Sequence, residues 1–195
     1  NTYQALMKED RESAAEIIEK DGEIDQVERD IEGICLKLLL RQQPVASDLR
    51  RVSSALKMIT DMERIGDQAA DIAEIIKTGN LKAPAEALGM GKMAKATMKM
   101  VRDSIDSFVK DDLDLAKQVI DADDEVDGQF EQIRHMLADG LVNKSATQEQ
   151  VLDLLMIAKY YERIGDHATN IAEWVVYSIT GVHKSAELTE RKEQE

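Results

Sequence analysis

The sequence predicts an all-α protein made of two tandem three-helix bundles, six helices in all, related by a pseudo-twofold internal repeat. The chain has only 2 prolines and 10 glycines among its 195 residues, and aromatic residues make up 4% of it. It is rich in Ala, Leu, Ile, Glu, Asp and Lys, a composition typical of helical proteins. Over long segments the apolar residues recur at three- and four-residue steps, which is the spacing of one helix face.

One short stretch occurs twice and organises the rest of the chain. Residues 63–67 read ERIGD, and the same five residues return at 162–166, an offset of 99. Upstream, residues 8–10 align with 110–112 at an offset of 102. The offset thus falls from 102 to 99 between the second and third helices of the repeat. We therefore expect the loop between these two helices to be three residues shorter in the second copy. A repeat of this length predicts two copies of one helical unit.

Each predicted helix has its own boundary signals. Residues 1–7 resemble the end of a helix, and the helical segment upstream of Lys110 has no counterpart before Asn1. We therefore expect most of the first helix to be missing from this sequence. The remaining helices are predicted over residues 10–43, 45–78, 84–110, 112–142 and 147–180.

Helix breakers and capping residues separate these segments. Pro44 cannot continue a helix interior, and Gly79 and Gly181 are typical helix stops. Thr147 and Gln150 have the spacing of a capping box that opens the last helix. The predicted organisation is a first repeat over residues 1–80, a second over 81–182 and a polar tail over 183–195.

The charge of the chain excludes several classes of partner. There are 39 acidic against 25 basic residues, a net charge of −14, which repels nucleic acid and anionic lipid. The single Cys35 allows no internal disulfide and suits a reducing compartment. Neither a transmembrane segment nor a signal peptide is visible. We expect a cytoplasmic protein whose partners are cations or other proteins.

Acidic residues spaced four apart occur on consecutive helices of both repeats. Carboxylates at this spacing lie one turn apart on one side of a helix and destabilise it unless a cation or a proton relieves them. Because the second and third helices of each repeat are antiparallel neighbours, their acidic pairs can meet beside the core. The candidate metal ligands are Asp21, Asp25, Glu63, Asp67 and Asp71 in the first repeat, and Asp123, Asp127, Glu162, Asp166 and Asn170 in the second.

All-oxygen ligands suit hard cations such as Mg, Ca, Mn and ferric iron, and are poor ligands for structural Zn. The sequence leaves Fe, Mn, Mg, Zn and Ca open. The alternative is that these residues are solvated acidic helix faces without metal. Gly66 and Gly165, which interrupt the two acidic motifs, are expected where helices approach closely. His167 is expected on the surface, about 100° around the helix from Asp166.

The sequence offers no nucleophile, and we expect a protein that is not an enzyme. No Ser/His/Asp set, P-loop or glycine-rich nucleotide turn is present. The main alternative is a di-iron carboxylate enzyme of the ferritin-like kind, which normally needs Glu-x-x-His on two helices. None of His135, His167 and His183 has an acid three residues before it. A third possibility, a purely structural helical scaffold, predicts no metal at all.

The doubled ERIGD motif, the segment RQQPVASDLR at residues 41–50 and the acidic second helices resemble the PhoU family of phosphate-signalling regulators. The resemblance covers nearly everything from Ala5 to Tyr177. It implies tandem three-helix bundles with multinuclear metal clusters on the acidic motifs. It also implies negative regulation of the phosphate-starvation response, with the phosphate ABC transporter and a membrane sensor kinase as partners, at the inner face of the membrane. We further expect a homodimer.

One difference between the repeats bears on the metal sites. Asn170 stands where the first repeat has Asp71, and an amide supplies no charge to a cation. Because affinity for hard cations depends on the charge of the ligands, we expect the first repeat to bind metal more tightly.

Overall fold

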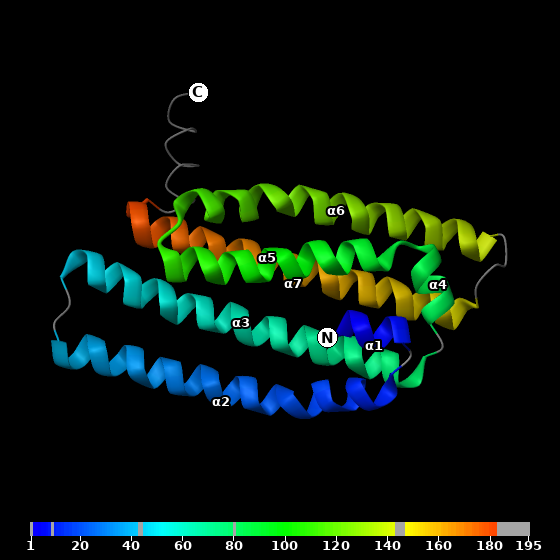
Figure 1. Cartoon of the computed structure of the whole chain (residues 1–195), viewed down its shortest axis with the longest axis horizontal. Helices are drawn as coiled ribbons and strands as arrows, with labels where there is room; N and C mark the ends of the chain where they lie inside the picture. The colour runs from blue at the N-terminus through cyan, green and yellow to red at the C-terminus, as the bar shows by residue number, and fades with distance from the viewer. Residues whose placement is uncertain (1, 9, 43–44, 80, 143–146, 183–195) are drawn as a thin grey trace, which may run out of the picture.

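The structure is a computed structural model that describes residues 2–8, 10–42, 45–79, 81–142 and 147–182. Within these ranges it contains seven helices and no strand (Figure 1), so the all-α prediction is confirmed. The helices are α1 (Thr2–Lys8), α2 (Arg11–Gln42), α3 (Ala46–Thr78), α4 (Lys82–Ala87), α5 (Met90–Lys110), α6 (Leu113–Val142) and α7 (Gln148–Thr180). The predicted tail, 183–195, lies outside the described residues.

The five long helices lie side by side in an elongated bundle (Figure 1). In the first repeat α2 packs on α3, and in the second α5, α6 and α7 pack on one another. α3 and α7 pack together as extensively as α2 and α3 do, so the two repeats share one hydrophobic core. That core includes Ile72 of α3, Met93 of α5 and Leu154 of α7, each fully buried. The division at residue 80 remains a prediction about the chain's organisation.

The prediction of one continuous helix over 84–110 is wrong. The chain forms the short helix α4, which ends at Ala87, and then α5, which begins at Met90. Gly89 separates them with φ of +70°, a left-handed conformation that glycine adopts without the steric cost of a side chain. The break adds a seventh helix to the described part of the chain, where six were predicted.

The predicted boundaries of the other helices are largely confirmed. The Thr147 hydroxyl accepts a hydrogen bond from the Gln150 N–H, and the Gln150 side chain accepts one from the Thr147 N–H. Gly181 ends α7 with φ of +77°, and Gly79 follows the last residue of α3. None of the helices in the described part of the chain combines the length and the apolar character needed to span a membrane.

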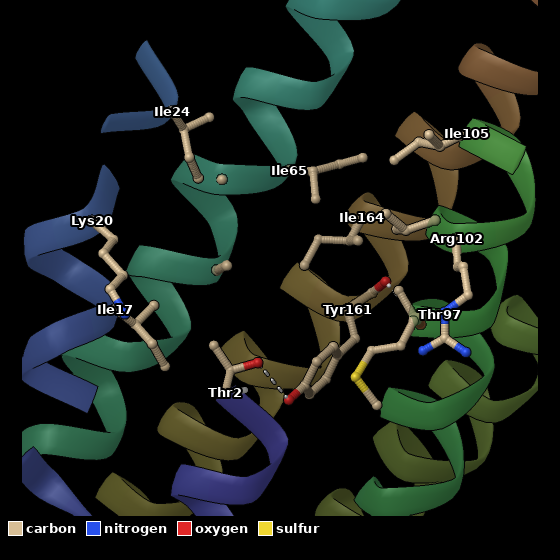
Figure 2. A pocket seen from close by; sticks show the side chains of 14 residues that line it. Thr2, Ile17, Lys20, Ile24, Ile65, Thr97, Arg102, Ile105, Tyr161 and Ile164 are labelled. Atoms are coloured by element: carbon tan, nitrogen blue, oxygen red, sulfur yellow. Dashed lines mark hydrogen bonds between the residues drawn. The ribbon is translucent and has the colours of Figure 1, made fainter. Parts of the chain in front are cut away.

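The first repeat leaves part of its α2–α3 face uncovered. In the second repeat Val126 of α6 is fully buried, whereas Ile24, its equivalent on α2, is 38% exposed. A cavity of about 550 Å³ lies here between α2, α3, α5 and α7 (Figure 2). Its walls are mainly apolar, and the pair formed by the Thr2 and Tyr161 hydroxyls, 3.3 Å apart, lies at one end. No carboxylate of the described residues lines this cavity, although Ile65 and Gly66 of the first ERIGD motif do.

The two motif glycines should respond differently to alanine. A Cβ at Gly165 would lie 3.4 Å from its nearest neighbour, Val126 Cγ1, which is ordinary contact. Gly165→Ala should therefore raise the free energy of unfolding by up to about 1 kcal/mol through helix propensity. A Cβ at Gly66 would lie 2.8 Å from Ile24 Cδ1. Gly66→Ala should therefore raise the free energy of unfolding by less than Gly165→Ala does, or lower it. Urea unfolding measures both, and an equal gain would contradict the close approach at Gly66.

Candidate metal centres

Carboxylates from α2 and α3 meet in the first repeat. Asp25 of α2 faces Glu63 and Asp67 of α3, and one oxygen from each carboxylate lies within 4.8 Å of the other two. The four-residue spacing places Glu63 and Asp67 one turn apart on the same side of α3. These three residues form the first acidic cluster.

The second repeat forms an equivalent group on α6 and α7. Asp127, Glu162 and Asp166 each place one oxygen within 4.8 Å of the other two. They correspond to Asp25, Glu63 and Asp67 at the repeat offsets. The structure therefore brings together six of the ten candidate ligands, in two matching triads. Asp127, Glu162 and Asp166 form the second acidic cluster.

Asp21 and Asp123 lie one turn before Asp25 and Asp127 on α2 and α6, beside the two motif glycines. A Cβ at Gly66 would lie 3.5 Å from Asp21 Oδ1, and one at Gly165 would lie 3.7 Å from Asp123 Oδ1. Both Oδ1 atoms are buried; Asp21 Oδ1 has no hydrogen-bond partner within the described residues, and the Asp123 carboxyl has only the Thr169 side chain nearby. Buried carboxylate oxygens normally have a partner, so these two atoms fit additional ligands to a cation.

Burial and mutual repulsion raise the pKa of several of these carboxyls. Burial raises the pKa of Asp166 to about 6, with further contributions from Glu162, Asp123 and Asp127. Burial raises the pKa of Glu63, and the charge of Asp67 adds to it. The same two causes raise the pKa values of Asp21, Asp123 and Asp127. Carboxylates that disfavour their own ionisation can bind either protons or a multiply charged cation.

The raised pKa of Asp166 predicts a pH dependence for the metal-free protein. Because folding raises this pKa above its ordinary value of 3.8, the folded state binds the proton more tightly than the unfolded state does. The resulting stabilisation is present at low pH and is lost as the pH rises through about 6. In EDTA, the thermal midpoint should rise as the pH falls from about 7.5 to about 5. Asp166→Asn should flatten this slope, and an unchanged slope would contradict the assignment.

Asn170 has a hydrogen-bond partner on α3, outside the second acidic cluster. Its amide donates to Asp61 Oδ1 of α3 at 3.3 Å. His167 Nδ1 lies 2.8 Å from the same oxygen, and because an ionised carboxylate only accepts, the ring nitrogen donates. The side chains of His167 and Asp61 are 12% and 10% exposed. The expectation of a surface His167 is therefore wrong, because α3 covers the face of α7 on which it lies.

Asp71 lies at the equivalent place across the pseudo-twofold. At the 99-residue offset Asp61 corresponds to Tyr160, and Asn170 corresponds to Asp71. Burial raises the pKa of Tyr160, and the charge of Asp71 beside it raises it further. Asp71 is also close enough to Asp21 to raise that pKa. Positions 71 and 170 thus lie where α3 and α7 pack, and Asp71 also lies near Asp21 of its own repeat.

Lys159, a cation beside the second acidic cluster, was not among the site residues predicted from the sequence. Its Nζ lies 2.6 Å from Glu162 Oε1 and 2.5 Å from Oε2. The three-residue spacing of Lys159 and Glu162 on one helix is a signal that could have found it. Asp61 carried no such signal, because its partners lie more than 100 residues away in the chain.

Comparison with known proteins identifies relatives along most of the chain. The model of the PhoU domain family matches residues 1–76 and 90–175. A phosphate-specific transport system accessory protein PhoU homologue from Clostridium acetobutylicum is 39% identical over 183 residues, covering 91% of this chain and 82% of the relative. A homologue from Pseudomonas aeruginosa is 34% identical over 195 residues, covering 97% of this chain and 80% of the relative.

Two solved structures share the fold. The crystal structure of PhoU from Pseudomonas aeruginosa matches with a TM-score of 0.83 at 33% identity, covering 93% of this chain and 88% of that one. The structure of the phosphate transport system regulatory protein PhoU from Streptococcus pneumoniae matches with a TM-score of 0.85 at 30% identity, covering 93% and 86%.

Proposed function

The chain belongs to the PhoU family, and from this premise we propose that it regulates phosphate uptake as a metal-binding accessory protein of a phosphate-specific transport system. The relatives named above are accessory or regulatory proteins of that system. We propose negative regulation, exerted by contact with the phosphate ABC transporter and a sensor kinase at the inner face of the membrane. This role requires binding surfaces rather than a catalytic group.

The observation that carries the metal-binding part of the proposal is the pair of matching acidic clusters. Each places three carboxylates within 4.8 Å of one another at equivalent positions of the two repeats. Three unneutralised carboxylates this close repel one another by several kcal/mol even at an effective dielectric constant of about 20. A bound cation would remove this repulsion and stabilise the contacts between α2 and α3 and between α6 and α7.

The residues present fit a hard cation. Every member of the two clusters is a carboxylate, and the buried Oδ1 atoms of Asp21 and Asp123 could complete the ligand sets. Oxygen ligands of this kind favour Mn, Mg, Ca or ferric iron over Zn. Within the described residues no histidine belongs to either cluster, whereas the di-iron enzymes considered above use one on each of two helices.

A reporter experiment tests the regulatory proposal. A bacterial strain that lacks its own PhoU should activate a phosphate-starvation promoter in phosphate-rich medium. Expression of this chain should restore repression, and the double variant Asp67→Ala/Asp166→Ala should not. The matched control is Asp121→Ala, which removes an exposed acid outside both clusters. Repression by the double variant would contradict a role for the clusters, and failure of the wild type would contradict the regulatory function.

Elemental analysis of the purified protein tests the metal separately. Protein prepared without chelator or added metal should contain a hard cation, and the double variant should not. A metal-free wild type with normal repression in the reporter strain would favour a helical scaffold that acts only through protein contacts.

A further inference from the structure

A lysine and a phenylalanine distinguish the second acidic cluster from the first. The Lys159 ammonium contacts both oxygens of Glu162 at 2.5–2.6 Å and lies 5.3 Å from the centre of the Phe130 ring. The Glu162 side chain is only 14% exposed. The contact with Glu162 stabilises this position of the ammonium by charge, and the contact with the Phe130 ring stabilises it by a cation–π interaction.

The first repeat has neither residue. Thr60 stands at the position of Lys159, and Glu28 at the position of Phe130. Glu28 is close enough to Glu63 to help raise its pKa, while the exposed Arg64 has only a smaller, opposing effect. At these two positions the clusters therefore have opposite neighbours, a negative charge in the first repeat and a positive charge in the second, while Asp124 and Glu131 add negative charge near Asp127.

We propose that Lys159 is a built-in counter-cation of the second acidic cluster, so that a divalent cation binds there only by displacing the ammonium from Glu162. The proposal rests on the metal-binding function proposed above. An incoming cation at the second cluster must separate Lys159 from Glu162 and then bind beside its positive charge. At the first cluster it meets an additional carboxylate. The two clusters consequently fill at different cation concentrations, the first one first.

Exchange of residues between the repeats provides the test, with Mn²⁺ as the probe. Titration calorimetry of the wild type should resolve a tighter and a weaker site, assigned by Asp67→Ala and Asp166→Ala. Lys159→Thr should strengthen the second site at least about tenfold, and Thr60→Lys should weaken the first by a similar factor, because the charge of the ammonium repels the incoming cation. Lys99→Thr is the matched control, because Lys99 pairs with Asp103 outside both clusters.

Thermal melts in EDTA test the counter-cation without any metal. Lys159→Thr should lower the midpoint and Thr60→Lys should raise it, because each changes the repulsion among unneutralised carboxylates. Loss of Mn²⁺ binding at both clusters would refute the proposed metal-binding function but leave these melts to decide the role of Lys159. Melting midpoints equal to that of Lys99→Thr, or Mn²⁺ affinities unchanged by either exchange, would overturn the proposal.

Discussion

Removing bound metal should lower the free energy of unfolding by about 5 kcal/mol, if both clusters were saturated at a hundredfold excess over Kd. Each independent site that binds only the folded state contributes about 2.7 kcal/mol under that condition. The physical reason is that each cluster holds three carboxylates within 4.8 Å of one another, and a cation relieves their repulsion. Urea unfolding in EDTA and in excess Mn²⁺ measures the difference.

Single variants should divide this effect between the repeats. Asp67→Ala should lose the contribution of the first cluster and Asp166→Ala that of the second, while both keep their helical content. Asp121→Ala, which removes an exposed acid elsewhere on α6, should retain the whole metal-dependent gain. Identical unfolding midpoints with EDTA and with Mn²⁺ in the wild type would refute the metal-dependent stabilisation.

Asp61→Ala should destabilise the protein by about 1–3 kcal/mol, because it leaves the half-buried His167 ring nitrogen without its acceptor and removes the bond from the exposed Asn170 amide. Asp61 Oδ1 accepts from His167 Nδ1 at 2.8 Å and from the Asn170 amide at 3.3 Å. These bonds join α3 of the first repeat to α7 of the second. Unlike the effect of the acidic clusters, this loss should be the same with and without metal. Urea unfolding in EDTA measures it directly.

Asp61→Asn is the matched variant, since its amide oxygen can still accept a hydrogen bond. It should cost less than Asp61→Ala. Asp48→Ala, at an exposed position of α3, should change stability by less than about 0.5 kcal/mol. An effect of Asp61→Ala no larger than that of Asp48→Ala would show that the bridge between the repeats contributes nothing to stability.

The expectation that the first repeat binds metal more tightly stays a prediction, but the structure changes its reason. Asn170 donates to Asp61 of α3, so its lack of charge bears less directly on the second acidic cluster. Lys159 contacts Glu162, and Glu28 helps to raise the pKa of Glu63, so these two residues alter the charge of the clusters in opposite senses. Exchange of Asp71 and Asn170 should therefore affect the two sites less than exchange of Thr60 and Lys159.

Much of the candidate site could be predicted because its geometry is local. Residues four apart on a helix lie on one side of it whatever the rest of the fold does, which brings Glu63 next to Asp67 and Glu162 next to Asp166. The repeat then predicts that α2 and α6 contribute in the same way, as Asp25 and Asp127 do. The same local rules predicted the cap at Thr147 and the stop at Gly181.

The helical class, the internal repeat and the helix faces that carry the carboxylates follow from the sequence, because periodicity and charge spacing are properties of neighbouring residues. The tertiary structure alone decided how α3 meets α7. That contact turns His167 inward onto Asp61 and bonds the Asn170 amide to the same carboxylate. Such contacts join residues more than 100 positions apart and depend on the rotation of one helix against another, which the pattern along either helix does not encode.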